Sequence, residues 1–215
     1  MTSATAGIMA RLRHETAELH RQAESRPLQK HLGAGTLPRE TYAAWMSQLL
    51  LVHQTLERLL DEQVRRASHS GFAQAWQSLA RHSDNLRSDL AHFGLNGDSI
   101  EALNATATLL ADLQQWGEQG DPALLGALYV LEGSMNGNRF IRKALERAYC
   151  STGGAGLSYL DPYGDAQRPT WQAFRERMDA AGFDESECEA ILAGANRMFR
   201  GIGEISDGQF EAMPA

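Results

Sequence analysis

Cysteine, proline and net positive charge are all scarce in this chain of 215 residues. Its two cysteines, Cys150 and Cys188, cannot build a disulfide framework and match no CxxC metal-ligand spacing. Acidic residues outnumber basic ones by 27 to 20, for a formal net charge of −7, so nucleic acid is not an expected partner. Residues 1–15 contain no apolar stretch typical of a secretory signal, and the longest apolar run, residues 123–131, is too short to span a bilayer. We therefore expect a reduced, soluble, cytoplasmic protein with no membrane partner.

Residues that favour helices dominate what is present, and no run of alternating β-branched residues indicates a strand. The apolar fraction of 43% is enough for a substantial core. Apolar spacing and the positions of proline and glycine predict helices over residues 8–25, 38–66, 71–93, 99–116, 122–149, 170–181 and 184–206. Residues 31–40 are predicted to form a loop, and residues 151–169 form the one long irregular segment. Because no repeat or linker divides the chain, we expect one all-α domain over residues 1–215, with its core at about 8–206.

A histidine, an acid and an arginine share one side of the first predicted helix. At 100° per residue, His20 lies about 80° from the buried Leu12, and Arg13 lies at nearly the same angle about 10 Å along the axis. Glu24 follows one turn after His20, within reach of its ring. An imidazole for iron, a carboxylate for its other nitrogen and a cation for a propionate together suit haem. A single histidine at the edge of a core is more often a surface or hydrogen-bonded residue, so both interpretations stay open.

The helix predicted over residues 122–149 carries Gly126, Gly133 and Gly137 on one face. Each glycine inside a helix costs about 1 kcal/mol relative to alanine, so the pair one turn apart needs a physical reason. One reason is close packing of a neighbouring helix, and the other is a flat ligand that lies directly on the backbone. By itself, the sequence of this helix slightly favours close helix packing over a flat ligand as the reason for the glycines. Packing between helices inside a membrane is excluded, since Glu132 and Arg139 lie in the same segment.

Three segments, in their order and spacing, resemble a haem oxygenase of the bacterial, biliverdin-producing type. LRHETAELHRQAES, at residues 12–25, resembles the proximal helix of that family, and GALYVLEGSMNGNRF, at residues 126–140, resembles its glycine-rich distal helix. GLSYLDPYG, TWQAFRERMDA and AILAGANRMFRGI resemble the last part of the family's chain. The resemblance covers about residues 8–206. It implies a multi-helix bundle that holds haem between the first helix and a kinked, glycine-rich distal helix.

The resemblance also implies a role for individual residues. His20 would bind the iron, and Glu24 would hold the other ring nitrogen. Gly133 and Gly137 would let the distal helix lie over the porphyrin and bend there, and Ser134 stands where animal members carry an aspartate that organises water. The remaining haem contacts would be Arg13 and Arg175 at the propionates, Phe199 on the haem wall, Leu128, Tyr129, Val130 and Ile141 on the distal side, and Ala23 and Gln29 on the proximal side.

The sequence departs from the family pattern at Asn138, where a second glycine is expected. A side chain at this position could crowd the haem, shift the bend, or donate a hydrogen bond to dioxygen or water. We place Asn138 with Gly133, Ser134 and Gly137 in the catalytic group. Trp171 stands where some members have a basic partner for a propionate, which leaves more of that task to Arg13 and Arg175.

The reaction that the resemblance implies uses haem b as both substrate and cofactor. A meso carbon, by family default the α carbon, is oxidised with dioxygen and electrons from an external donor, giving biliverdin, carbon monoxide and ferrous iron. The donor would be a ferredoxin, a flavodoxin or an NAD(P)H-dependent reductase. Residues 131–138 contain no histidine, and we expect their one acid, Glu132, to point away from the glycine face.

Three other classes of protein are alternatives. One of them, a purely structural helical interaction domain, would leave the glycine-rich helix and the line of Arg13, His20 and Glu24 unexplained. A haem-binding or trafficking protein of the same fold with little turnover is favoured by Asn138, and adding a reductant in air would separate it from an oxygenase. A di-iron oxidase needs converging carboxylates and histidines, typically with a Glu-x-x-His spacing, and no predicted core helix has one. We expect the other scattered histidines at the surface or in loops: His31, His53, His69, His82 and His92.

Overall fold

The structure, a computed structural model, describes residues 7–66, 70–149 and 151–213, and this part of the chain contains helices and turns but no strand. The α-helices are α1 (Ile8–Glu15), α2 (Ala17–Ser25), α3 (Pro27–Ala34), α4 (Arg39–Arg66), α5 (Ser70–Trp76), α6 (His82–His92), α7 (Asn104–Gln119), α8 (Ala123–Tyr149), α9 (Gln167–Ala180) and α10 (Glu185–Glu211). Three short 3-10 helices, η1 (Thr152–Gly154), η2 (Ser158–Leu160) and η3 (Gly164–Ala166), lie between α8 and α9. The predicted all-α fold is confirmed.

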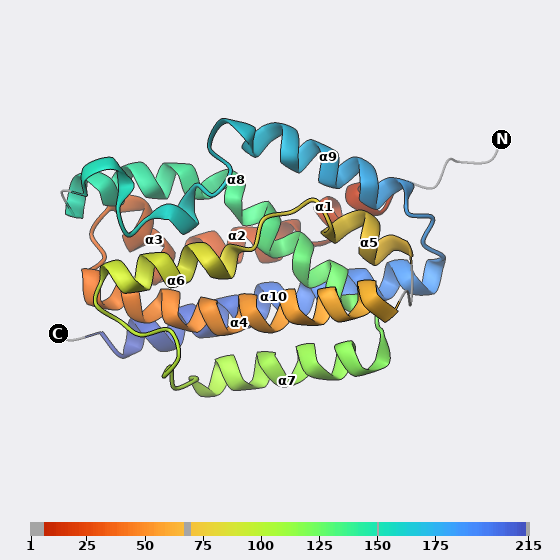
Figure 1. Cartoon of the computed structure of the whole chain (residues 1–215), viewed down its shortest axis with the longest axis horizontal. Coiled ribbons are helices and arrows are strands. Elements are labelled where there is room, and N and C mark those ends of the chain that lie inside the picture. The colour runs from red at the N-terminus through yellow and green to blue at the C-terminus, as the bar shows by residue number, and fades with distance from the viewer. Residues whose placement is uncertain (1–6, 67–69, 150, 214–215) are drawn as a thin grey trace.

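Two long helices, α4 and α10, run through the molecule, and α7 lies along the outer side of α4 (Figure 1). α8 packs most extensively on α10 and changes direction part-way along its length, while its backbone stays helical (Figure 1). The buried apolar side chains form one connected core. No described helix is both long enough and apolar enough to cross a membrane.

The contact between α8 and α10 is a backbone-to-backbone contact made by two glycines. A Cβ atom added to Gly126 would lie 1.9 Å from the carbonyl oxygen of Ile191, and one added to Gly194 would lie 2.1 Å from that of Ala123. No side chain fits at such distances, so these glycines allow the two helices to approach closely. Close packing therefore explains Gly126.

The first predicted helix, residues 8–25, is interrupted. Thr16 leaves the helical conformation, at φ −96° and ψ 0°, and its hydroxyl donates to the carbonyl oxygen of Leu12 at 2.7 Å. The Leu12 carbonyl also accepts the backbone N–H of Thr16 at 3.0 Å, and an added bond of this kind is typical of a bend in a helix. Residues 8–25 therefore form two helices that meet at Thr16 instead of one straight helix. α2 has no buried residue, so Leu19 and Ala23 are only partly covered.

Several other boundaries differ from the sequence-based prediction, since α9 begins at Gln167 and α10 continues to Glu211. The predicted loop at residues 31–40 is wrong in its first part, because α3 begins with Pro27 at its first turn and continues to Ala34. The helix predicted over residues 71–93 is broken between α5 and α6, where Asp61 accepts hydrogen bonds from Trp76 and Arg81, both at 2.6 Å. α7 begins later than predicted because the buried Gln48 side chain bonds to residues 101, 103 and 106.

The irregular segment after α8 is fixed to the core by a buried carboxylate. Asp89 of α6 accepts hydrogen bonds from the backbone N–H groups of Ser158 at 2.9 Å and Tyr159 at 2.8 Å. These two bonds hold η2 against α6 and determine where the Tyr159 side chain lies, although the segment has no long helix of its own.

The start of α10 gives a prediction about stability. Asp184 accepts a hydrogen bond from the N–H of Glu187 at 2.9 Å, and the Glu187 carboxylate accepts one from the N–H of Asp184 at 2.8 Å, which is a complete capping box. Replacing Asp184 with alanine should lower the free energy of unfolding by about 1 kcal/mol, measured by urea denaturation. Asp165, an exposed acid outside this cap, gives the matched control Asp165→Ala, which should change stability by less than about 0.5 kcal/mol. Equal effects of the two substitutions would contradict the role of the cap.

Candidate functional site

A cavity of about 980 Å³ opens between α1, α2, α8, α9 and α10. Its size is at the upper end of the range of about 300–1,000 Å³ that is typical of small-molecule sites. Apolar residues predominate in its lining, and a few polar groups face it from different helices. The cavity is therefore suited to a large, mostly apolar ligand with a small number of charged groups.

His20 lines this cavity from α2. Its Nδ1 atom lies 3.5 Å from Oε2 of Glu24, one turn later, and its ring meets the ring of Phe199 edge-on at 5.9 Å. The imidazole side chain is 57% exposed, so it is held by few protein contacts. With Glu24 facing Nδ1, Nε2 is the ring nitrogen left available to a metal ion.

The glycine face of α8 forms another wall of the cavity. A Cβ atom added to Gly137 would meet no atom within 4 Å, and one added to Gly133 would lie 3.4 Å from the Trp171 ring. No neighbouring helix uses the space that Gly137 leaves, unlike the space at Gly126. Helix packing therefore explains Gly126 but not Gly137, and the open backbone there leaves room for a flat ligand.

Two arginines, Arg13 of α1 and Arg175 of α9, line the cavity with exposed side chains. Both act electrostatically on the hydroxyl of Tyr129, which is also hydrogen-bonded to Thr16. Burial raises the pKa of Tyr129, while the Thr16 hydrogen bond and the two arginine charges act in the opposite direction. Two cations thus approach the cavity from α1 and α9, an arrangement that suits the carboxylates of a ligand.

Ser134 and Asn138 of the glycine-rich segment differ in how far their hydrogen-bond donors are already used. The hydroxyl of Ser134 donates to the carbonyl oxygen of Leu131 at 2.7 Å. The buried Asn138 side chain makes a weak contact, 3.5 Å from its Nδ2 to Sδ of Met135, so its N–H groups keep most of their donor capacity. Asn138 therefore has a hydrogen to offer to a ligand in the cavity, and Ser134 does not.

The structure brings nearly all of the predicted site residues together. One of them, Leu128, does not line the cavity, because it is buried in the core on another face of α8. The predicted residues that do line it are Arg13, His20, Ala23, Glu24, Gln29, Tyr129, Val130, Gly133, Ser134, Gly137, Asn138, Ile141, Arg175 and Phe199.

Several lining residues were missed by the sequence analysis. Trp45 and Leu49 come from α4, Ile202 comes from α10, and Tyr159 comes from the irregular segment. The first three read as ordinary core positions of an amphipathic helix, and nothing local marks Tyr159. Only the three-dimensional fold shows that these residues reach the cavity.

The expectation that His53 and His82 lie at the surface or in loops is wrong. Both are 2% exposed. Nε2 of His82 lies 2.7 Å from Oε1 of the buried Glu132, which also accepts a hydrogen bond from the Tyr163 hydroxyl at 3.1 Å. Hydrogen bonds to residues of distant segments offset the free-energy cost of burying these side chains. No local sequence pattern reveals which residues those partners are.

Glu132 itself points away from the glycine face, as expected, and does not line the cavity. His31 is half-buried beside Thr36 and Phe210, and His92 is exposed. His69 and Cys150 lie outside the described residues. Among the described residues, no group of three or more histidines, cysteines or acids is arranged to hold a metal ion.

Comparison with known proteins assigns the chain to a family. The family model described as Heme oxygenase matches residues 6–206. The chain belongs to the haem oxygenase family. Heme oxygenase 1 of Gallus gallus is 24% identical over 194 residues, which cover 87% of this chain and 64% of that protein.

Solved structures show the same fold. The haem oxygenase of Leptospira interrogans matches with a TM-score of 0.81 and 22% identity, over 94% of this chain and all of that one. Heme oxygenase-2 from Synechocystis, solved with haem and NO, matches with a TM-score of 0.88 and 18% identity, over 96% of this chain and 86% of that one. The helical scaffold around the cavity is therefore that of the haem oxygenase fold.

Proposed function

We propose that this protein is a haem oxygenase, which opens haem at a meso carbon to biliverdin, carbon monoxide and ferrous iron with dioxygen and an external reductant. One observation carries the proposal: the free space over Gly137 and the imidazole of His20 belong to one cavity. The family to which the chain belongs supports the same activity. We propose haem b as the form of haem that is bound.

The residues present fit this ligand. His20 would bind the iron through Nε2, since Glu24 faces Nδ1 and favours a proton there. The flat porphyrin would lie against the backbone of Gly133 and Gly137. When bound, haem supplies the iron that takes up dioxygen and the carbon that is oxidised.

Charged groups at the cavity determine which way the ligand faces. Arg13 and Arg175 would hold the propionates. These contacts would fix the rotation of the porphyrin in the cavity and so decide which meso carbon faces the glycine-rich wall. We propose the α carbon as the one that is cleaved.

The distal wall supplies no strong acid. Glu132 is turned into the core, where His82 and Tyr163 bond to it. On this wall the amide of Asn138, backbone groups and water would donate to dioxygen and orient it, with no acidic side chain that pulls it apart. This arrangement favours attack on the ring carbon and supports an oxygenase over a haem carrier.

The test is a single turnover. Purified protein is loaded with haem, and ascorbate or a ferredoxin with its reductase is then added in air. We expect the Soret band to decay while the absorbance of biliverdin rises. A Soret band that persists while haem stays bound would contradict the proposal and favour a carrier. The reductase, flavodoxin or ferredoxin that serves in the cell, and the cytoplasmic location, remain predictions.

A further inference from the structure

The helix α2, which carries His20, is only weakly held by the rest of the protein. None of its residues is buried. It ends at Ser25, where Arg26 takes an extended conformation, with φ −65° and ψ 147°, before α3 begins at Pro27. A helix without a buried face has no core packing to fix it. Contacts along α10 and at the end of α2 must therefore determine where His20 stands.

One stripe of α10 receives α2. Phe199, Gly203 and Asp207 follow one another at intervals of four residues, so they lie on the same side of that helix. The ring of Phe199 meets the ring of His20 edge-on at 5.9 Å. One and two turns further along α10, Gly203 and Asp207 meet Arg26. The stripe thus contacts the chain both at the proposed iron ligand and just beyond the end of its helix.

Gly203 makes room for the Arg26 side chain. A Cβ atom added to this buried glycine would lie 2.5 Å from Nε and 2.6 Å from Cζ of Arg26, and all three of its nearest atoms belong to that side chain. Glycine inside a helix lowers its stability relative to alanine, so its presence needs a reason. At Gly126 the reason is the backbone of a neighbouring helix, and at Gly203 it is a guanidinium that lies directly on the α10 backbone.

Asp207 holds the guanidinium in this position. Its carboxylate pairs with Nη1 of Arg26, and the two side chains are 41% and 28% exposed. The pair connects α10 to the end of α2 across 181 positions of the chain. An ion pair this exposed adds little to the stability of the whole fold. It has more influence on a helix that has no buried residue of its own.

We propose that Arg26 is a positioning residue for His20. Its guanidinium, seated on Gly203 and paired with Asp207, fixes the end of α2 on α10 and so sets how far the imidazole reaches into the cavity. We name Arg26, Gly203 and Asp207 the α2 clamp. Its effect on haem rests on the proposed function, in which His20 binds the iron. Its effect on α2 is a property of the protein without haem.

The first experiment therefore uses the protein without haem. Hydrogen exchange of backbone amides, followed by NMR, reports how often a helix opens. In Arg26→Ala we expect the amides of residues 20–25 to exchange at least about threefold faster, because the free energy of one partly exposed ion pair is lost. The amides of α4 should exchange as before. Unchanged exchange in α2 would overturn the proposal.

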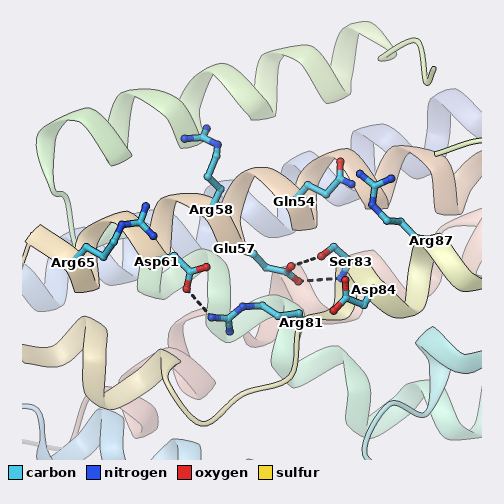
Figure 2. A pocket seen from close by; sticks show the side chains of 9 residues that line it. All are labelled: Gln54, Glu57, Arg58, Asp61, Arg65, Arg81, Ser83, Asp84 and Arg87. Carbon is cyan, nitrogen blue, oxygen red and sulfur yellow. Dashed lines mark hydrogen bonds and ion pairs between the residues drawn. The ribbon is translucent and has the colours of Figure 1, made fainter. Parts of the chain in front are cut away.

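Arg81 supplies the matched control. It pairs with Asp61 at 2.6 Å in a second, outer pocket of about 400 Å³ at α4 and α6, and the two side chains, 35% and 37% exposed, are about as accessible as those of the clamp pair (Figure 2). Arg81 also lies over the Trp76 ring at 3.8 Å, so its loss should disturb the fold at least as much. Neither Arg81 nor Asp61 lines the cavity. In Arg81→Ala we expect exchange in α2 and haem affinity within about twofold of the unsubstituted protein.

The second experiment measures haem affinity by titration of the Soret band. Arg26→Ala should lower the affinity at least about threefold, the effect of one partly exposed ion pair. The iron–imidazole stretching band of the ferrous complex, recorded by resonance Raman spectroscopy, should shift or broaden because the ring is less firmly held. Arg26→Lys keeps a cation for Asp207 and should retain most of the affinity. An Arg26→Ala protein with unchanged affinity and an unchanged Raman band would overturn the proposal.

Gly203→Ala tests the clamp without removing a charge. The new methyl group must displace the Arg26 guanidinium, which is the end of a flexible side chain, so the α10 backbone stays in place. We expect a loss of haem affinity similar to that in Arg26→Ala, in a protein that unfolds at the same or a higher urea concentration because alanine favours the helix. This variant keeps the test decisive if Arg26→Ala does not fold. Full haem affinity in Gly203→Ala would contradict the seat on α10.

The proposed function and the clamp can fail separately. If the unsubstituted protein binds haem and forms no biliverdin, the proposed function fails, while hydrogen exchange and haem affinity still decide whether Arg26 positions α2. If biliverdin forms and α2 of Arg26→Ala exchanges as in the unsubstituted protein, the function stands and the clamp is wrong.

Discussion

Replacing His20 with alanine should abolish conversion of haem while leaving the protein folded. Loss of a residue that merely orients a metal ligand costs about 10–100-fold in affinity or activity, so loss of the ligand itself should reduce turnover by at least about 100-fold. The fold should survive because the His20 side chain is 57% exposed and α2 has no buried residue. The measurement is the spectrum of the haem complex with the rate of biliverdin formation, and the free energy of unfolding as a check.

His14 is the matched control for this substitution. It lies in α1, its side chain is exposed, and it does not line the cavity. His14→Ala should therefore bind and convert haem at rates within about twofold of the unsubstituted protein, in line with the small effects of surface changes. If His20→Ala retained full turnover, or if His14→Ala lost it, the assignment of His20 to the iron would be wrong.

A leucine at Gly137 should block haem binding and leave stability unchanged or higher. A Cβ atom there meets nothing within 4 Å, and leucine favours a helix over glycine by somewhat less than about 1 kcal/mol. The side chain would fill the space that we assign to the porphyrin. We expect haem affinity, measured by titration of the Soret band, to fall at least about tenfold, in a protein that unfolds at the same or a higher urea concentration.

At Gly126 of the same helix, we expect a larger side chain to lower the stability of the protein. A Cβ atom at Gly126 would lie 1.9 Å from the carbonyl oxygen of Ile191, so Gly126→Ala must push α10 away from α8. Overpacking of this severity should cost about 3 kcal/mol of unfolding free energy or more. A stable Gly126→Ala protein, or a Gly137→Leu protein that unfolds easily, would contradict the distinction between a packing glycine and a ligand-facing one.

Local sequence signals predicted much of this fold because their causes are local. Pro27 follows the predicted helix end at residue 25, and Asp184 with Glu187 marks the start of α10 close to the predicted residue 184. The helix that begins at Pro27 was not predicted. Glycines show where such signals fail. The sequence predicts a helix end at Gly117, but α7 continues to Gln119 and ends at Gly120, which has a φ of +69°.

Gly117 has a different cause, which depends on the rest of the fold. A Cβ atom there would lie 2.3 Å from Leu59, and its carbonyl oxygen accepts a hydrogen bond from Gln63 at 2.7 Å. The residue thus allows α7 to pack on α4. A helix terminator and a packing glycine are identical in sequence, and only the neighbouring helix distinguishes them.

The residues of the candidate site also fall into two groups, those that local sequence patterns reveal and those that only the packing of distant segments reveals. His20 and Glu24 could be found because they lie one turn apart in α2. Gly133 and Gly137 could be found because they lie one turn apart in α8, and both segments resemble a known family. Tyr159 and its partner His53 are 106 positions apart, and a bond between them depends on how α4 and η2 pack. The burial of His53 and His82 was missed for this reason, since polar residues read as surface residues unless their partners are known.

The crystal structure of the haem complex would test the central claim most directly. We predict that the iron is bonded to a ring nitrogen of His20 and that the porphyrin face lies against the backbone of Gly133 and Gly137, with its propionates toward Arg13 and Arg175. Haem bonded through another histidine, or bound outside this cavity, would contradict the account.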